Sequence, residues 1–241
     1  MDFLDSINLV DIVIIAIIGL SIAYGMYSGL LSSVINIAGL VLAWGCAFFM
    51  YSTLSEWIVE NTELLQQIVH YTEGASNIKS LETARTVVSA VPESFIAQAV
   101  KDANFPWPFN NMLMENIAGQ VYAAQGLSTF EDYFNYTLAY AALNIISFLT
   151  ILLTIYALFS IINVLLTYVL KLPVLRQFDS LLGGGFGLIR GVFVVFVLFL
   201  LVPIVLAVVP VTLVQDMLNE SRLASFFYDG NFLLAAIKSV F

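Results

Sequence analysis

Long apolar stretches alternate with short polar breaks along much of the chain. The apolar stretches cover about residues 10–27, 30–50, 144–166 and 186–209. Each is long enough to cross a bilayer, whose hydrocarbon core needs about 20 helical residues. A membrane β-barrel would instead alternate apolar and polar residues in segments of about 10, and these stretches do not alternate. The pattern therefore predicts an all-α membrane protein with four transmembrane helices.

The polar positions divide the chain into four parts. Only a short glycine-containing link separates the first two spans, so we predict a tight transmembrane hairpin over residues 1–50. Residues 51–127 hold many of the acids and repeat apolar positions at spacings of 3, 4 and 7, which is typical of amphipathic helices. We interpret them as a helical, acidic, extramembrane insertion between spans two and three. Residues 128–210 form the second hairpin, and residues 211–241 form an amphipathic tail suited to a membrane surface.

The third span belongs to a longer predicted helix. Ser128 and Glu131 have the spacing of a capping box, with Ser as the N-cap and Glu at position N3. No Gly or Pro follows until Pro173, so the pattern predicts one continuous helix about 65 Å long at 1.5 Å per residue. A bilayer is thinner than this. We therefore expect the first turns to stand outside the membrane and to pack on residues 51–127.

Composition agrees with a membrane protein and excludes several function classes. Charged residues make up 10% of the 241-residue chain, against about a quarter in soluble domains. The net charge of −9 argues against binding to nucleic acid, which requires clustered Lys and Arg. Cys46 and His70 are the sole cysteine and histidine, so a Cys/His zinc cluster is excluded. We find no nucleophile–base set or phosphate loop and predict no enzymatic activity, no cofactor and no metal.

The few basic residues predict an orientation. Lys171, Arg176 and Arg190 cluster around the link between the last two spans, and basic residues in short loops mark the cytoplasmic side. We therefore predict that both tight links face the cytoplasm, whereas both termini and residues 51–127 lie outside. The N-terminus lacks the basic residues of a cleavable signal peptide, so we expect the first span to remain in the membrane.

Small residues recur every four positions on three of the predicted spans: Gly25 and Gly29; Gly39, Ala43 and Ala47; Gly183, Gly187 and Gly191. In lipid, small residues allow two helix backbones to approach closely. The ridges therefore predict tight packing within the protein, or association into a small homo-oligomer.

Polar and small residues follow one face of the third span and include Asn144, Ser147, Thr154 and Asn163. Two interpretations stay open. The stripe can line a water-filled path, or its members can bond across helices and to their own carbonyls. Asp11 and Arg190 lie near predicted span ends, where snorkelling or interfacial pairing explains them. No ionisable residue falls at the predicted middle of a span.

One segment resembles the hallmark of a known family. Residues 178–191 read Phe-Asp-Ser-Leu-Leu-Gly-Gly-Gly-Phe-Gly-Leu-Ile-Arg-Gly. This is similar to the motif of the bacterial colicin V production protein (CvpA) family, in which Asp or Asn precedes Leu-Gly, Phe-Gly and Arg-Gly at the opening of the last membrane helix. The matching positions are Asp179, Gly183, Gly187, Arg190 and Gly191.

The N-terminal part also resembles this family. Asp11 precedes the first span, and Gly25, Gly29-Leu30 and Trp44 match further positions. The family commonly has Arg just before the glycine between spans one and two, where this chain has Ser28.

The resemblance implies a four-helix protein of the bacterial inner membrane, and no catalytic residue or cofactor carries over from it. We therefore expect a non-enzymatic multi-pass protein that supports bacteriocin or toxin production, secretion and envelope homeostasis. It would act in the lipid bilayer through self-association or through envelope or secretion proteins that dock on residues 51–127. The alternative is a subunit of a small-solute or ion channel or transporter, whose path is lined by the polar stripe.

Overall fold

The computed structural model describes residues 8–72, 78, 80–103, 108–169, 176–202, 204–205, 216, 218 and 220–237. Its long helices are α1 (Leu9–Asn61), α7 (Phe130–Val169) and α8 (Arg176–Phe199). The shorter ones are α2 (Leu64–Tyr71), α4 (Leu81–Ala84), η1 (Val88–Ala90), α5 (Glu93–Ala103), α6 (Phe109–Ala118), η2 (Ala123–Gln125), α11 (Arg222–Asp229) and α12 (Phe232–Ala236). Lys171 and Pro173, on which two predictions depend, lie outside the described residues.

Three helices in the described part of the chain are long and apolar enough to cross a membrane. They are Leu9–Asn61, Phe130–Val164 and Phe178–Phe199. The all-helical membrane class is therefore supported. The count of four spans stays a prediction, because the first two predicted spans fall on one helix, α1.

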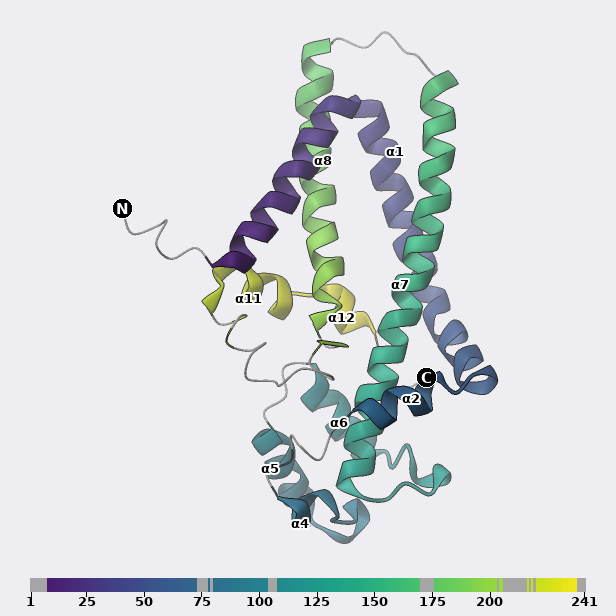
Figure 1. The fold of residues 1–241 in the computed structure, drawn as a ribbon, viewed down its shortest axis with the longest axis vertical. Coiled ribbons are helices and arrows are strands. Elements are labelled where there is room, and N and C mark those ends of the chain that lie inside the picture. The colour runs from purple at the N-terminus through teal and green to yellow at the C-terminus, as the bar shows by residue number, and fades with distance from the viewer. Residues whose placement is uncertain are drawn as a thin grey trace. The chain divides into compact units, whose positions relative to one another are not determined.

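A sharp bend divides α1 into two arms (Figure 1). Gly29 lies at the bend with φ 79° and ψ 175°, which is not helical. Glycine adopts positive φ at little cost because it has no Cβ. The first arm therefore comprises residues 9–28, and the second comprises residues 30–61.

The start of α7 differs by one residue from the predicted capping box. The Asp132 N–H donates to Thr129 Oγ1 at 3.2 Å, and the Thr129 N–H donates to Asp132 Oδ2 at 3.0 Å. Thr129 is therefore the N-cap, and the Ser128–Glu131 pair was wrong. The reason is a tertiary contact, because the Ser128 carbonyl accepts a bond from the Val88 N–H at 3.0 Å in extended backbone. From Phe130 onward the predicted continuous helix is confirmed over 40 residues.

Helix α8 also begins earlier than the predicted fourth span. It starts at Arg176, ten residues before Phe186, and its described helical run ends at Phe199. The glycine ridge and Arg190 therefore lie inside the helix. Arg190 is close to the middle of the 22-residue candidate span Phe178–Phe199, which corrects the expectation that no ionisable residue sits at a span's middle.

The chain divides into two compact units. The first unit comprises Met1–Tyr51, Ser147–Val202 and Thr212–Leu233, and the second comprises Ser52–Ile146, Pro203–Val211 and Leu234–Phe241. The boundaries between the units fall inside α1 and α7.

The second unit has its own apolar core. Buried residues of α2, α4, α5 and α6 pack with the first turns of α7, including Phe130 and Tyr133. Tyr122 is fully buried there, and its ring stacks on that of Tyr140 with 5.8 Å between centroids. The first turns of α7 thus pack on residues 51–127, as the length of the helix predicts.

Candidate functional site

Two of the three predicted small-residue ridges, the one that contains Gly25 and the one that contains Gly183 and Gly187, meet where the first arm of α1 crosses α8. A Cβ added to Gly25 would overlap the carbonyl oxygen of Gly183, and a Cβ on Gly183 would overlap that of Gly25. One added to Gly187 would lie 2.5 Å from the carbonyl oxygen of Ser21. The two backbones are therefore in direct contact, which is how small residues hold helices together in lipid. We call this contact the glycine crossing.

The crossing uses one face of α8. A Cβ on Gly191 would lie 3.0 Å from the Cα of Ile18, which extends the contact by one turn. By contrast, a Cβ on Gly185 would meet nothing within 4 Å. The four-residue spacing of the ridge therefore marks the contact face, whereas the neighbouring glycine of the Gly-Gly-Gly run serves no such contact.

Asp179 closes one end of the glycine crossing. The bend at Gly29 interrupts α1, so the Leu30 N–H begins the second arm and needs an acceptor from outside its helix. Asp179 Oδ1 accepts this bond at 2.7 Å. A Cβ on Gly29 would overlap the Asp179 carboxylate. Glycine at the bend thus provides both the backbone conformation and the space for the capping carboxylate.

Arg190 links α8 to the first arm of α1 toward the Gly191 end of the crossing. Its Nε donates to Ser21 Oγ at 3.0 Å, and its Nη2 donates to the Ser21 carbonyl at 3.1 Å. The guanidinium carbon lies 4.7 Å from the centroid of the Tyr24 ring, within the range of a cation–π contact. Ser21 Oγ in turn donates to the Gly187 carbonyl at 2.8 Å.

Sequence reasoning missed Ser21 and Tyr24. Ser21 precedes Gly25 by one helical turn, so helical spacing places it on the same face. That spacing was the available signal. This spacing indicates a functional role for Ser21 only when the structure shows that Arg190 lies opposite Ser21.

Asp11 has a structural role different from the expected one. It is 4% exposed and accepts bonds from Ser221 Oγ at 2.6 Å and from the Leu223 N–H at 3.0 Å. Both donors lie at the N-terminus of α11, which sits beside the start of α1 (Figure 1). Asp11 therefore does not snorkel toward headgroups but anchors the start of α11.

Helix α11 also packs on α8 through aromatic rings. The Phe227 ring lies 5.0 Å from that of Phe196 and 6.0 Å from that of Phe199, measured between centroids. Part of the predicted amphipathic tail thus covers the C-terminal end of α8.

The residues of the polar stripe on α7 differ in burial and in hydrogen-bond partners. Asn163 Nδ2 donates to Asn36 Oδ1 of the second arm at 2.8 Å, and both residues are buried. Thr154 is exposed and donates to the Thr150 carbonyl of its own helix at 2.7 Å. Ser147 is fully buried in the first unit, and Asn144 is fully buried in the second.

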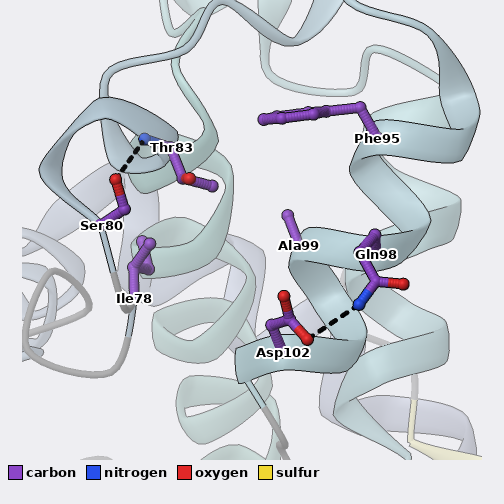
Figure 2. Close-up of a pocket in the computed structure, with 7 residues that line it drawn as sticks. All are labelled: Ile78, Ser80, Thr83, Phe95, Gln98, Ala99 and Asp102. Carbon is purple, nitrogen blue, oxygen red and sulfur yellow. Dashed lines mark hydrogen bonds between the residues drawn. The ribbon is translucent and has the colours of Figure 1, made fainter.

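A small pocket lies between α4 and α5 of the second unit (Figure 2). Its polar lining groups serve the helices that carry them: Ser80 Oγ accepts the Thr83 N–H at 3.4 Å, and Asp102 accepts from Gln98 Nε2 at 2.9 Å. Phe95 contributes apolar lining. This pocket is separate from the residues of the glycine crossing.

Comparison with known proteins gives the family of the chain. The family model described as Colicin V production protein matches residues 10–96 and 112–231. The match includes both helices of the glycine crossing, and it extends beyond the two hairpins into residues 51–96 and 112–127. Searches of curated proteins and of solved structures give no match. The family match covers most of the chain, and the chain therefore belongs to the colicin V production protein family.

Proposed function

We propose that this chain is a non-enzymatic, multi-pass protein of the bacterial inner membrane. It supports bacteriocin or toxin production, secretion and envelope homeostasis by binding partner proteins or a second copy of itself. Family membership and three long apolar helices support the membrane role. One observation carries the mode of action: the charged motif residues hold helices together, with Asp179 bonded to Leu30 and Arg190 bonded to Ser21.

Residues 51–127 are the proposed docking surface. Several large apolar side chains are exposed in this part of the second unit, including Trp57, Tyr71, Leu81 and Phe95. Exposed apolar groups set among acidic residues are typical of protein-interaction surfaces. Under the proposed orientation this surface faces outward and is accessible to envelope or secretion proteins.

The test is a growth-inhibition assay with a strain that carries a bacteriocin determinant but lacks this chain. We expect wild-type protein to restore the zone of inhibition, whereas Asp179→Ala reduces it because the Leu30 N–H loses its acceptor. Asp179→Asn keeps an acceptor oxygen and is expected to retain most activity. Asp229→Ala is the matched control, because Asp229 is an exposed carboxylate at the end of α11. Immunoblots of membrane fractions verify equal amounts.

Equal zones with and without the chain would refute the proposed role. The alternative, a channel or transporter subunit, predicts that Asn163→Leu lowers solute flux through proteoliposomes. The bond from Asn163 to Asn36 and the bond from Thr154 to its own helix favour helix packing over a solute path.

A further inference from the structure

Arg190 is a permanent cation in the interior of an apolar helix. It lies 11 residues after Asp179 on α8, which corresponds to about 16 Å at 1.5 Å per residue. A guanidinium stays protonated in proteins, so burial cannot remove this charge. Charged side chains within membrane-spanning helices are costly and mark functional sites.

The contacts of Arg190 within the chain satisfy only part of its guanidinium. Of the five N–H groups on this side chain, one donates to Ser21 Oγ and one to the Ser21 carbonyl. Both acceptors are uncharged. In the described part of the chain no carboxylate lies within 4.0 Å of the guanidinium. The remaining donors and the charge of Arg190 are therefore available to an anionic ligand.

The carboxylates bonded near the first arm have other partners, and Glu220 accepts from Asn8 Nδ2 at 3.4 Å. Asp179 is bonded to the Leu30 N–H at the bend, and Asp11 is bonded to Ser221 at the other end of the arm. The anionic ligand is therefore better sought in the surrounding lipid.

The guanidinium lies beside Ser21 and Tyr24 of the first arm. Helical side chains lean toward the N-terminus of their helix, and for Arg190 this is the Asp179 end of α8. Tyr24 and Tyr27 follow on the first arm in the same direction and are 52% and 89% exposed. Tyrosine rings are enriched at the level of lipid headgroups. The guanidinium of Arg190 thus lies at one end of an exposed aromatic surface formed by Tyr24 and Tyr27.

We propose that Arg190, positioned by Ser21 and Tyr24, binds the phosphate of an anionic phospholipid beside these two residues of the first arm. The guanidinium presents paired N–H donors that match phosphate oxygens. The bond from its Nε to Ser21 fixes the orientation of this fork, and the Tyr24 ring covers one of its faces. The bound lipid contacts α1 and α8 together and stabilises their crossing.

The experiment uses the full chain purified in a neutral detergent and measures bound lipid by native mass spectrometry. Phosphatidylglycerol and phosphatidylcholine with identical acyl chains are added in parallel, and inorganic phosphate is added as a competitor. We expect wild type to prefer phosphatidylglycerol at least about tenfold, since bonds between charged groups are worth one or more factors of ten. Arg190→Gln abolishes the preference. Arg85→Gln is the matched control, because Arg85 is exposed on the second unit and outside the candidate spans.

Three results would overturn the proposal. Wild-type preference in Arg190→Gln would place the lipid at other basic groups. Displacement of the lipid by inorganic phosphate would indicate a site for free anions. A change in the dimer fraction alone in Arg190→Gln would indicate a carboxylate from a protein partner. If Arg190→Gln does not fold, the double variant Ser21→Ala/Tyr24→Leu replaces it. This variant keeps the charge but removes its positioning, and we expect at least about a threefold loss of preference.

Discussion

Replacing Gly187 by Ala tests the closest part of the glycine crossing. The added Cβ would lie 2.5 Å from the Ser21 carbonyl oxygen and 3.0 Å from the Cα of Ile22. Ordinary van der Waals contact begins at 3.4 Å, so the two helices must separate locally by about 0.9 Å. Both obstacles are backbone atoms, which cannot move aside as a flexible side chain can. The separation also lengthens the 2.8 Å bond from Ser21 Oγ to the Gly187 carbonyl.

The expected cost follows from comparison with Gly185→Ala. Overpacking of a close-packed interior costs about 1–3 kcal/mol. Alanine also favours the helix over glycine by about 1 kcal/mol, but this gain is the same at both positions and cancels in the difference. Gly185 has open space around its Cβ position. We therefore expect Gly187→Ala to be about 1–3 kcal/mol less stable than Gly185→Ala.

Reversible unfolding in mixed micelles, followed by tryptophan fluorescence, measures this difference. Gly185→Ala should match or exceed the stability of wild type, because it gains helix propensity without a clash. Equal stability of the two alanine variants would refute the reasoning, since it would mean that α1 and α8 do not approach at backbone contact.

Three further predictions address other contacts. Asn36→Leu removes the oxygen that accepts the Asn163 Nδ2 bond, so it should lower the free energy of unfolding by about 1–3 kcal/mol. The double variant Asn36→Leu/Asn163→Leu replaces both partners with apolar groups and should recover much of this loss in the same unfolding assay. Ser221→Ala removes both the N-cap of α11 and a donor to Asp11. Amide hydrogen exchange in α11 should therefore accelerate by about the factor that corresponds to 1 kcal/mol. Unchanged exchange would contradict the role of Asp11 in anchoring α11. Burial raises the pKa of the Tyr122 phenol above its ordinary value of 10.0, so above pH 10 the folded state keeps a proton that the unfolded state loses. The resulting stabilisation of the fold is complete below pH 10 and declines as the pH rises further. Tyr122→Phe should therefore lose less stability than wild type between pH 9 and 11.

The sequence by itself determined those features that depend on local pattern. Apolar stretches of spanning length indicated an all-helical membrane protein, because lipid requires every backbone group to be bonded within a helix or a closed barrel. The lack of Gly and Pro after residue 128 indicated the continuous helix α7. The four-residue spacing of Gly183, Gly187 and Gly191 indicated a contact face, because one turn of helix returns a residue to the same side.

Only the tertiary structure decided how these elements meet. Asp179 and Leu30 are 149 positions apart, and Asp11 and Ser221 are 210 apart, so no local pattern pairs them. The fourth span was predicted to begin at about residue 186, after the Gly-Gly-Gly run, but backbone contact with α1 offsets the low helix propensity of glycine, and α8 runs through these glycines. That continuation moved Arg190 from the expected helix end to the middle of a candidate span. The sequence gives this residue its charge, and packing against α1 brings it opposite Ser21 and Tyr24.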